Sequence, residues 1–170
     1  MNIKFLLLSI MMVLILSTGL TSCFFYTFKD ISIKPDVNSY FVEDITLNTN
    51  APGSIHNTFT EMLKQKINTE TRLRSTESDP HIIFEGSIDG FTVTSTATDS
   101  QNTASLNKLE IRIRIKYTNE LHPEENWEQT FSDFANFDRN VNLSDVQDAL
   151  IKEIYELILD KIITRSFSNW

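Results

Sequence analysis

The most regular hydrophobic pattern in the chain is the sequence LEIRIRIKYTN, which begins at Leu109. Apolar and charged residues alternate through it, and this two-residue period is typical of a strand with one buried face. Arg112, Arg114 and Lys116 all fall on the opposite, outward face. The pattern therefore predicts a strand over 106–118 that carries a row of three cations on its solvent side.

A second long strand is predicted over 81–95, with a change of phase inside it. Ile82, Phe84 and Ile88 fall on one face, whereas Phe91 and Val93 fall on the other. A β-bulge at Gly90 would restore a single buried face, whereas an Asp-Gly turn would end the strand in a hairpin. We favour the bulge, because the polar segment 96–105 is a better place for the chain to reverse.

Two shorter strands and two helices complete the pattern. Clusters of β-forming residues predict strands over 40–47 and 125–134. Helical spacing of apolar residues predicts one helix over 54–69 and another from Ser144 to about Phe167, where Ser144 and Gln147 form a capping-box pattern. The buried stripe of the last helix is predicted to be Val146, Leu150, Ile154, Leu157, Ile158 and Ile162.

Four more apolar residues widen this stripe, namely Ile151, Tyr155, Leu159 and Ile163. They fit either a thick core or a surface for a partner. The element order β-α-β-β-β-α predicts an α+β fold, in which a mostly antiparallel four-stranded sheet has two helices packed on one face.

The first residues have the features of a secretion signal. Lys4 precedes an almost wholly apolar run, and small and hydroxyl residues lead to Cys23. The run is too short to favour a membrane-spanning anchor. The sequence LTSC, which ends at Cys23, resembles the lipobox of bacterial lipoproteins, so residues 1–22 are predicted to be a lipoprotein signal peptide and Cys23 to carry fatty acids such as palmitate. Residues 23–38 would be the lipidated N-terminus and tether, and 39–170 a single domain.

Composition argues against several classes of function. The formal net charge of -8 disfavours nucleic acid as a partner. The only cysteine is committed to lipid, so no thiol nucleophile or thiolate metal ligand remains. His56, His81 and His122 show no metal-binding spacing, and the four glycines form no phosphate-binding loop. We therefore expect no enzyme activity, no metal site and no cofactor.

Several motifs together resemble the LptE family of lipopolysaccharide-assembly lipoproteins, in a divergent branch. They are YTF soon after the lipidated cysteine, IIFEGSIDGFTVT (82–94), TASLNKLEIRIRIKYTN (103–119), FSDFANFD (131–138) and the terminal NW. The resemblance implies an LptE-like domain that acts as a plug and chaperone for an LptD-like outer-membrane β-barrel and assists lipopolysaccharide delivery. It also implies a protein anchored by lipid to the periplasmic side of the outer membrane, and Phe24 after the cysteine carries no inner-membrane retention signal.

The row of cations then has two possible partners. Guanidinium groups bind phosphate and carboxylate oxygens bidentately, so Arg112, Arg114 and Lys116 are candidates for contact with lipopolysaccharide or with acidic groups on the barrel's inner wall. We weigh the barrel slightly above the glycolipid. The plain alternative is a solvated sheet face without a ligand.

Two other lipoprotein functions compete with this one. An LpoB-like activator of a cell-wall synthase would need a long spacer after the lipid, whereas structured-looking sequence begins here a few residues after Cys23. A glycan-binding lipoprotein would display exposed aromatic residues. The candidates are Phe24, Phe25, Trp127 and Trp170.

Overall fold

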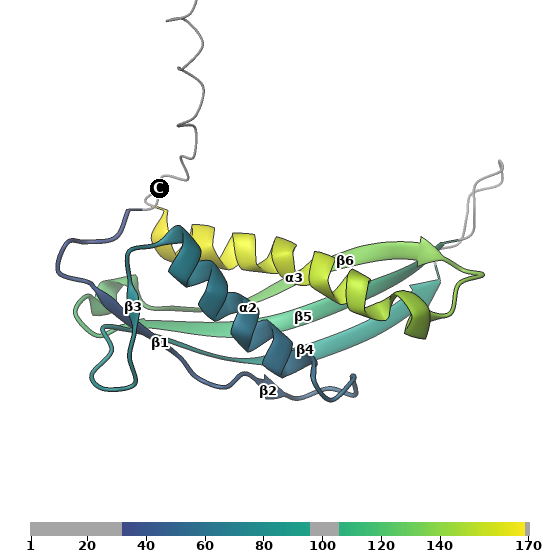
Figure 1. The fold of residues 1–170 in the computed structure, drawn as a ribbon, viewed down its shortest axis with the longest axis horizontal. Coiled ribbons are helices and arrows are strands. Elements are labelled where there is room, and N and C mark those ends of the chain that lie inside the picture. Colours follow the sequence, from purple (N-terminus) through teal and green to yellow (C-terminus); the bar gives the residue numbers. More distant parts are fainter. Residues whose placement is uncertain (1–31, 96–105, 169–170) are drawn as a thin grey trace, which may run out of the picture. The chain divides into compact units, whose positions relative to one another are not determined.

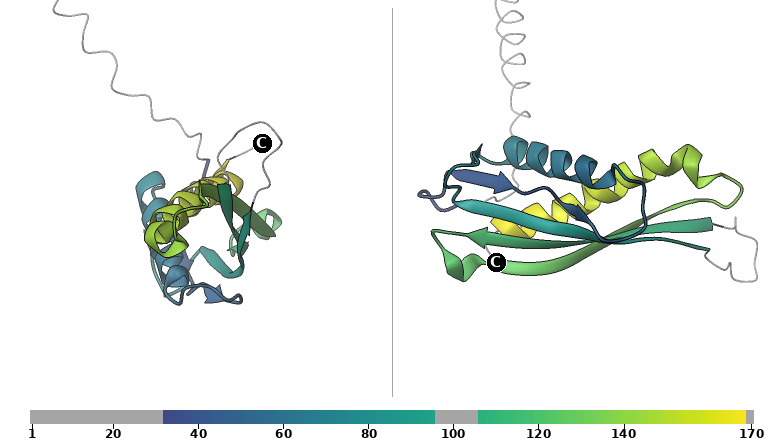
Figure 2. Two further views of the ribbon diagram at one scale, coloured as in Figure 1. Left: turned by 90° about the vertical axis from the view of Figure 1, so that its right-hand side faces the viewer. Right: turned by 90° about the horizontal axis from the view of Figure 1, so that it is seen from below.

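A six-stranded sheet and two α-helices form the part of the chain described by the structure, a computed structural model covering residues 32–95 and 106–168 (Figure 1). In chain order the elements are β1 (Ser39–Val42), β2 (Thr46–Leu47), α2 (Ile55–Glu70), β3 (Arg74–Ser75), β4 (Ile82–Ser95), β5 (Leu106–Asn119), the 3-10 turn η1 (Pro123–Glu125), β6 (Trp127–Asp138) and α3 (Leu143–Phe167). Both α-helices lie on one face of the sheet (Figure 2). The predicted α+β fold is confirmed.

The sheet is mixed in direction and has two strands more than predicted. Its order is β3-β1-β4-β5-β6, with β2 also paired to β4. The long pairs β4–β5 and β5–β6 are antiparallel, whereas β1 and β2 run parallel to β4 and β3 runs parallel to β1. The last strand also extends beyond its predicted end, from Trp127 to Asp138.

The predicted strand over 40–47 is divided into β1 and β2. Val42 pairs with Phe84, and Thr46 pairs with Ser87. The segment that joins β1 to β2 is therefore one residue longer than the segment of β4 that it follows. The extra length lets Ile45 enter the core, where it is 1% exposed. The break also explains why apolar and polar residues alternate only loosely over 40–47.

The bulge in β4 is confirmed. The register with β5 shifts between Ile88 and Gly90, so that Ile88 lies opposite Ile113 and Phe91 lies opposite Ile111. Both partners on β5 are fully buried. The single extra residue, Asp89, therefore returns the second half of β4 to the apolar face.

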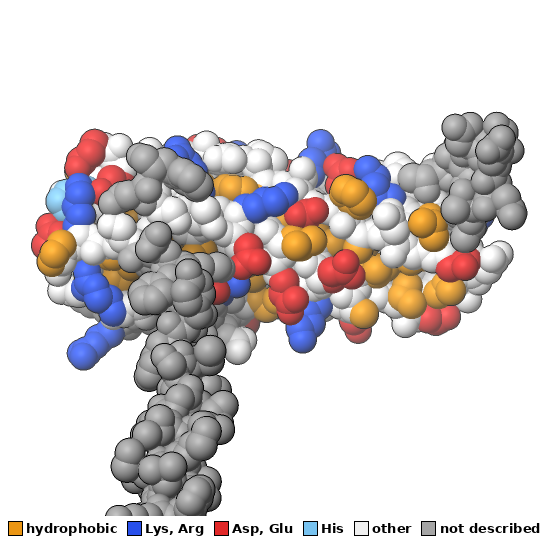
Figure 3. Space-filling view, turned by 90° about the horizontal axis from the view of Figure 1, so that it is seen from above, with side chains coloured by type: hydrophobic (Ala, Val, Ile, Leu, Met, Phe, Trp, Pro, Cys, Tyr) orange, Lys and Arg blue, Asp and Glu red, His pale blue; other side chains and the backbone are white. Residues whose placement is uncertain are grey.

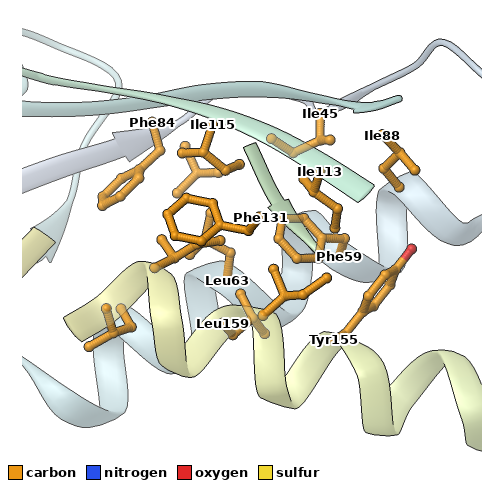
Figure 4. Packing of buried hydrophobic residues seen from close by; sticks show 14 of the residues in the cluster. Ile45, Phe59, Leu63, Phe84, Ile88, Ile113, Ile115, Phe131, Tyr155 and Leu159 are labelled. Carbon is orange, nitrogen blue, oxygen red and sulfur yellow. The ribbon is translucent and has the colours of Figure 1, made fainter. Parts of the chain in front are cut away.

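The core lies between the sheet and the two helices. Phe59 and Leu63 of α2 and Leu159 of α3 converge on the inward side chains of β5 (Figure 4). Tyr155 packs edge-on against Phe59, with ring centroids 5.0 Å apart, and its hydroxyl donates to the backbone oxygen of Ile55 at 3.1 Å. This bond satisfies a polar group that burial would otherwise destabilise.

The buried side of α3 is rotated from the predicted stripe toward α2. Its nine buried residues are Leu150, Ile151, Ile154, Tyr155, Ile158, Leu159, Ile162, Ile163 and Phe167. The four residues that widened the predicted stripe are thus part of the core, because α2 covers that side. Leu157, which we predicted to be buried, is 41% exposed at the opposite margin.

The capping-box prediction for α3 is wrong. The helix begins at Leu143 with Asn142 as its N-cap, and no side chain caps it. Ser144 lies inside the first turn, and its hydroxyl is 3.4 Å from a carboxylate oxygen of Asp145. None of the helices within the described ranges is long and apolar enough to cross a membrane.

The described domain has two distinct ends. At one end, the N–H of Ser32 donates to the backbone oxygen of Phe167 at 2.7 Å, and Lys34 forms ion pairs with Glu124 and Glu125 of η1. We call this the Ser32 end. The other, the hairpin end, is where β4 stops and β5 starts, and the 14 residues of β4 separate the two by roughly 45 Å.

Candidate functional site

The three predicted cations lie in one row on β5, on the face of the sheet opposite the helices. Arg112, Arg114 and Lys116 are exposed, whereas Ile113 and Ile115 between them are fully buried. The flanking strands β4 and β6 bring further polar side chains to the same face. We call this surface the outward face.

Two of the three cations are already paired with carboxylates of the flanking strands. The ammonium of Lys116 lies 2.6 Å from a carboxylate oxygen of Glu85 on β4. Arg114 lies 3.0 Å from Asp89 on β4 and 3.5 Å from Glu128 on β6. These hydrogen bonds raise the pKa of Arg114 and of Lys116, so both side chains remain charged at physiological pH.

The bulge creates the Arg114 contact. The extra residue Asp89 accepts a hydrogen bond from the Ser87 hydroxyl at 2.7 Å, one from Arg114 at 3.0 Å and one from the Asn48 amide at 3.3 Å. An adjoining hollow of about 320 Å³ is lined by Thr46, Asn48, Glu85, Gly86, Ser87, Arg114, Lys116 and Glu128. The hollow is polar and is lined by charges of both signs.

Asp89 makes the stability of this network dependent on pH. The Ser87 hydroxyl, and then Arg114 and Asn48, lower the pKa of Asp89 below its usual value of 3.8. A depressed pKa in the folded state stabilises the fold above the unfolded pKa, and this stabilisation is lost as the pH falls through the folded value. We expect Asp89→Asn to lower the free energy of unfolding at pH 7, with the difference from wild type shrinking below about pH 4. Urea unfolding from pH 3 to pH 7 measures this, and a difference that does not change with pH would contradict it.

Arg112 is arranged differently from its two neighbours. Among the described residues, no carboxylate lies within ion-pair distance of its guanidinium. Its side chain lies across Gly90, so closely that a Cβ at that glycine would be only 2.7 Å from the Arg112 Nε. Gly90 thus provides the space that the Arg112 side chain occupies.

The outward face continues toward the hairpin end with a cation and an aromatic ring. Lys108 lies 2.7 Å from Glu110 and 5.3 Å from the ring centroid of Phe134. Phe134 is 48% exposed. Taken together, the cations Lys108, Arg112, Arg114 and Lys116 are matched by the carboxylates Glu85, Asp89, Glu110 and Glu128. Within the described ranges, the row is therefore a charge-balanced network in which the guanidinium of Arg112 takes part in no ion pair.

The side of the domain that is seen from above also shows no patch of one charge in its described part. On the side that carries α3, basic and acidic side chains are interspersed, with hydrophobic side chains among them (Figure 3). Lys66 of α2 bridges Glu70 and Asp160 there, at 2.9 and 2.7 Å.

The other candidate residues do not assemble into a site. No group of three histidine, cysteine or acidic side chains suited to a metal ion occurs in the described ranges. His122 pairs with Asp36 at 2.8 Å, and Asp133 pairs with Lys161 at 2.9 Å. Trp127 stacks on Tyr117, with ring centroids 5.5 Å apart, which accounts for much of its burial. Cys23, the segment 96–105 and Trp170 lie outside the described residues.

Sequence comparison identifies a family. The family model described as "LptE: Lipopolysaccharide-assembly" matches residues 31–166, and no curated protein sequence matches the chain.

Solved structures share the fold at low sequence identity. A putative neuraminyllactose-binding hemagglutinin homolog from Helicobacter pylori is 10% identical, with a TM-score of 0.53, over 84% of this chain and 90% of that one. The hypothetical protein CT253 from Chlamydia trachomatis is 8% identical, with a TM-score of 0.52, over 78% and 99%. A minor lipoprotein from Acinetobacter baumannii is 7% identical, with a TM-score of 0.50, over 76% and 91%.

Proposed function

Since the chain belongs to the LptE lipopolysaccharide-assembly family, we propose that it is the lipoprotein subunit of an outer-membrane lipopolysaccharide translocon. In this role it assists the assembly of an LptD-like β-barrel and the delivery of lipopolysaccharide to the outer leaflet. It acts by binding and positioning, without catalysis. The observation that carries the proposal is the family match, which spans nearly all of the described domain.

The N-terminus fits this role. The lipobox-like sequence before Cys23 supports removal of residues 1–22 and acylation of the cysteine. Two or more acyl chains give stable anchoring, because each buried methylene contributes about 0.8 kcal/mol. The anchor would hold the domain at the periplasmic side of the outer membrane, with the Ser32 end nearest in sequence to the lipid.

We propose that the outward face is the surface that meets the barrel. The inner walls of outer-membrane barrels are polar, so a balanced array of charges can exchange ion pairs with them. Arg112 is the residue best placed to bind a partner's carboxylate, because its guanidinium has no acidic partner in the described part of the chain. A phosphate of lipopolysaccharide is the second candidate ligand for the same group.

Charge reversal on the outward face tests this surface. The double variant Arg112→Glu with Arg114→Glu is expected to reduce recovery of the barrel with the tagged protein by about tenfold, because like charges are then brought against the wall. Lipopolysaccharide binding measured on the same variant separates the two ligands. The matched control is Lys152→Glu on α3, which reverses an exposed charge on the helix side of the sheet. Unchanged barrel recovery and unchanged lipopolysaccharide binding by a folded double variant would contradict the proposed contact.

Depletion of the protein tests the function itself. Cells that lose it are expected to contain less folded barrel and less lipopolysaccharide at the cell surface. Both are measured directly, by heat-modifiable mobility of the barrel on gels and by labelling of intact cells. Normal levels of both after depletion would contradict the proposal.

A further inference from the structure

The sheet has one strand edge that is neither short nor guarded by charges. β1 pairs with β4 as far as Phe84, and β2 pairs with it as far as Ile88. Beyond Ile88, no described residue pairs with β4 on the side away from β5. We call the residues Phe91–Ser95 on this side the open edge.

The edge formed by β6 is guarded. Asp133 points inward from β6 and pairs with Lys161 of α3 at 2.9 Å. The same lysine donates to the backbone oxygen of Ser132 at 3.0 Å, and the same aspartate accepts from the N–H of Phe134 at 3.0 Å. Inward-pointing charges of this kind are a known protection of edge strands against unwanted pairing. At the other border of the sheet, β3 has only two residues.

The open edge has no such protection. Its sequence, FTVTS, contains no charge, and Thr92 to Ser95 are exposed. Val93 is opposite Leu109 on the inward, apolar face, yet it is 43% exposed whereas Leu109 is fully buried. The reason is that α2 begins at Ile55 and covers only the half of the sheet toward the Ser32 end (Figure 1). An exposed apolar side chain therefore accompanies an unpaired backbone.

We infer that the open edge binds an extended strand of a partner protein, which pairs with Phe91–Ser95 and continues the sheet beyond β2. Five residues are a typical strand length, and main-chain hydrogen bonds supply affinity in such strand additions. Apolar or aromatic residues on the added strand would face Phe91 and Val93, and uncharged polar residues would face Thr92 and Thr94. The added strand is expected to be uncharged, because no side chain of the open edge carries a charge that could pair with it.

A strand from another protein fits better than a second copy of this chain. Each copy of the chain carries a formal net charge of -8, and a net charge of one sign opposes the association of identical chains. The strand of another protein carries no such penalty when it is uncharged. It would end where β2 begins to pair, since Leu47 pairs with Ile88.

Site-specific photo-crosslinking of the full-length protein in intact cells tests the inference. A photoreactive residue is placed at Thr94 on the open edge and, as the matched control, at Gln129 on the guarded β6 edge. The Gln129 side chain is also exposed, and it lies on the helix side of the sheet, because Gln129 pairs with Ile115. We expect position 94 to give an adduct whose crosslinked peptide is an uncharged, extended segment of another protein. Position 129 is expected to give none.

Two further variants in the position-94 background separate strand addition from chance proximity. Val93→Lys places a charge on the apolar face of the open edge and should reduce the adduct several-fold, whereas the β-branched Val93→Thr should retain it. Thermal unfolding of both variants checks that the exposed site tolerates them. An adduct between two copies of this chain, equal adducts from positions 94 and 129, no adduct, or an adduct that Val93→Lys leaves unchanged would each overturn the inference. The result is separate from the barrel-recovery test of the outward face, so either proposal can fail alone.

Discussion

Replacing Cys23 with alanine is expected to remove nearly all of the protein from the outer-membrane fraction. The alanine cannot be acylated, and the anchoring contribution of about 0.8 kcal/mol per buried methylene is lost entirely. Because Cys23 is the only cysteine, the change disturbs no disulfide. Membrane fractionation and intact mass of the protein measure the effect.

Ser22→Ala is the matched control for this variant. It changes the neighbouring small residue and keeps the cysteine, so the protein should remain acylated and in the membrane fraction. A Cys23→Ala protein that stays in the outer membrane without fatty acid would show that another feature anchors it, and the tether that we propose would be wrong.

Replacing Leu159 with alanine is expected to lower the free energy of unfolding by about 2–5 kcal/mol. Leu159 is 1% exposed and packs with α2 over the sheet, so its truncation leaves a cavity in the core. Urea unfolding monitored by circular dichroism measures the change.

The same substitution at Leu157 provides the control within one helix. Leu157 is 41% exposed, and its truncation should change the free energy of unfolding by no more than about 0.5 kcal/mol. Helical periodicity in the sequence predicted Leu157, and not Leu159, in the main buried stripe. A larger loss at Leu157 than at Leu159 would therefore show that α3 packs through the face that periodicity predicted.

The sequence alone predicted the buried faces of strands that follow a regular local pattern. The alternation of β5 set its two faces, and the phase change at Asp89 and Gly90 predicted the bulge that the register confirms. Both predictions used the two-residue alternation of side chains along a strand, and the folded sheet keeps this alternation. The family resemblance rested on the same segments.

Features set by contacts between distant elements were beyond the sequence. The buried side of α3 depends on the position of α2. The spacing of apolar residues within α3 gives no information on that position. The pairing of Arg114 with Asp89 depends on the bulge and the cross-strand register together. Sequence reasoning therefore predicted three equivalent cations, whereas the fold pairs two of them and places Arg112 over Gly90 without a carboxylate partner among the described residues.

Affinity purification of the acylated protein from detergent-solubilised outer membranes tests the proposed function most directly. We predict recovery of a very large β-barrel protein at equal stoichiometry, determined by quantitative mass spectrometry of the purified complex. Recovery of a cell-wall synthase in place of the barrel would contradict the proposal and favour the LpoB-like alternative.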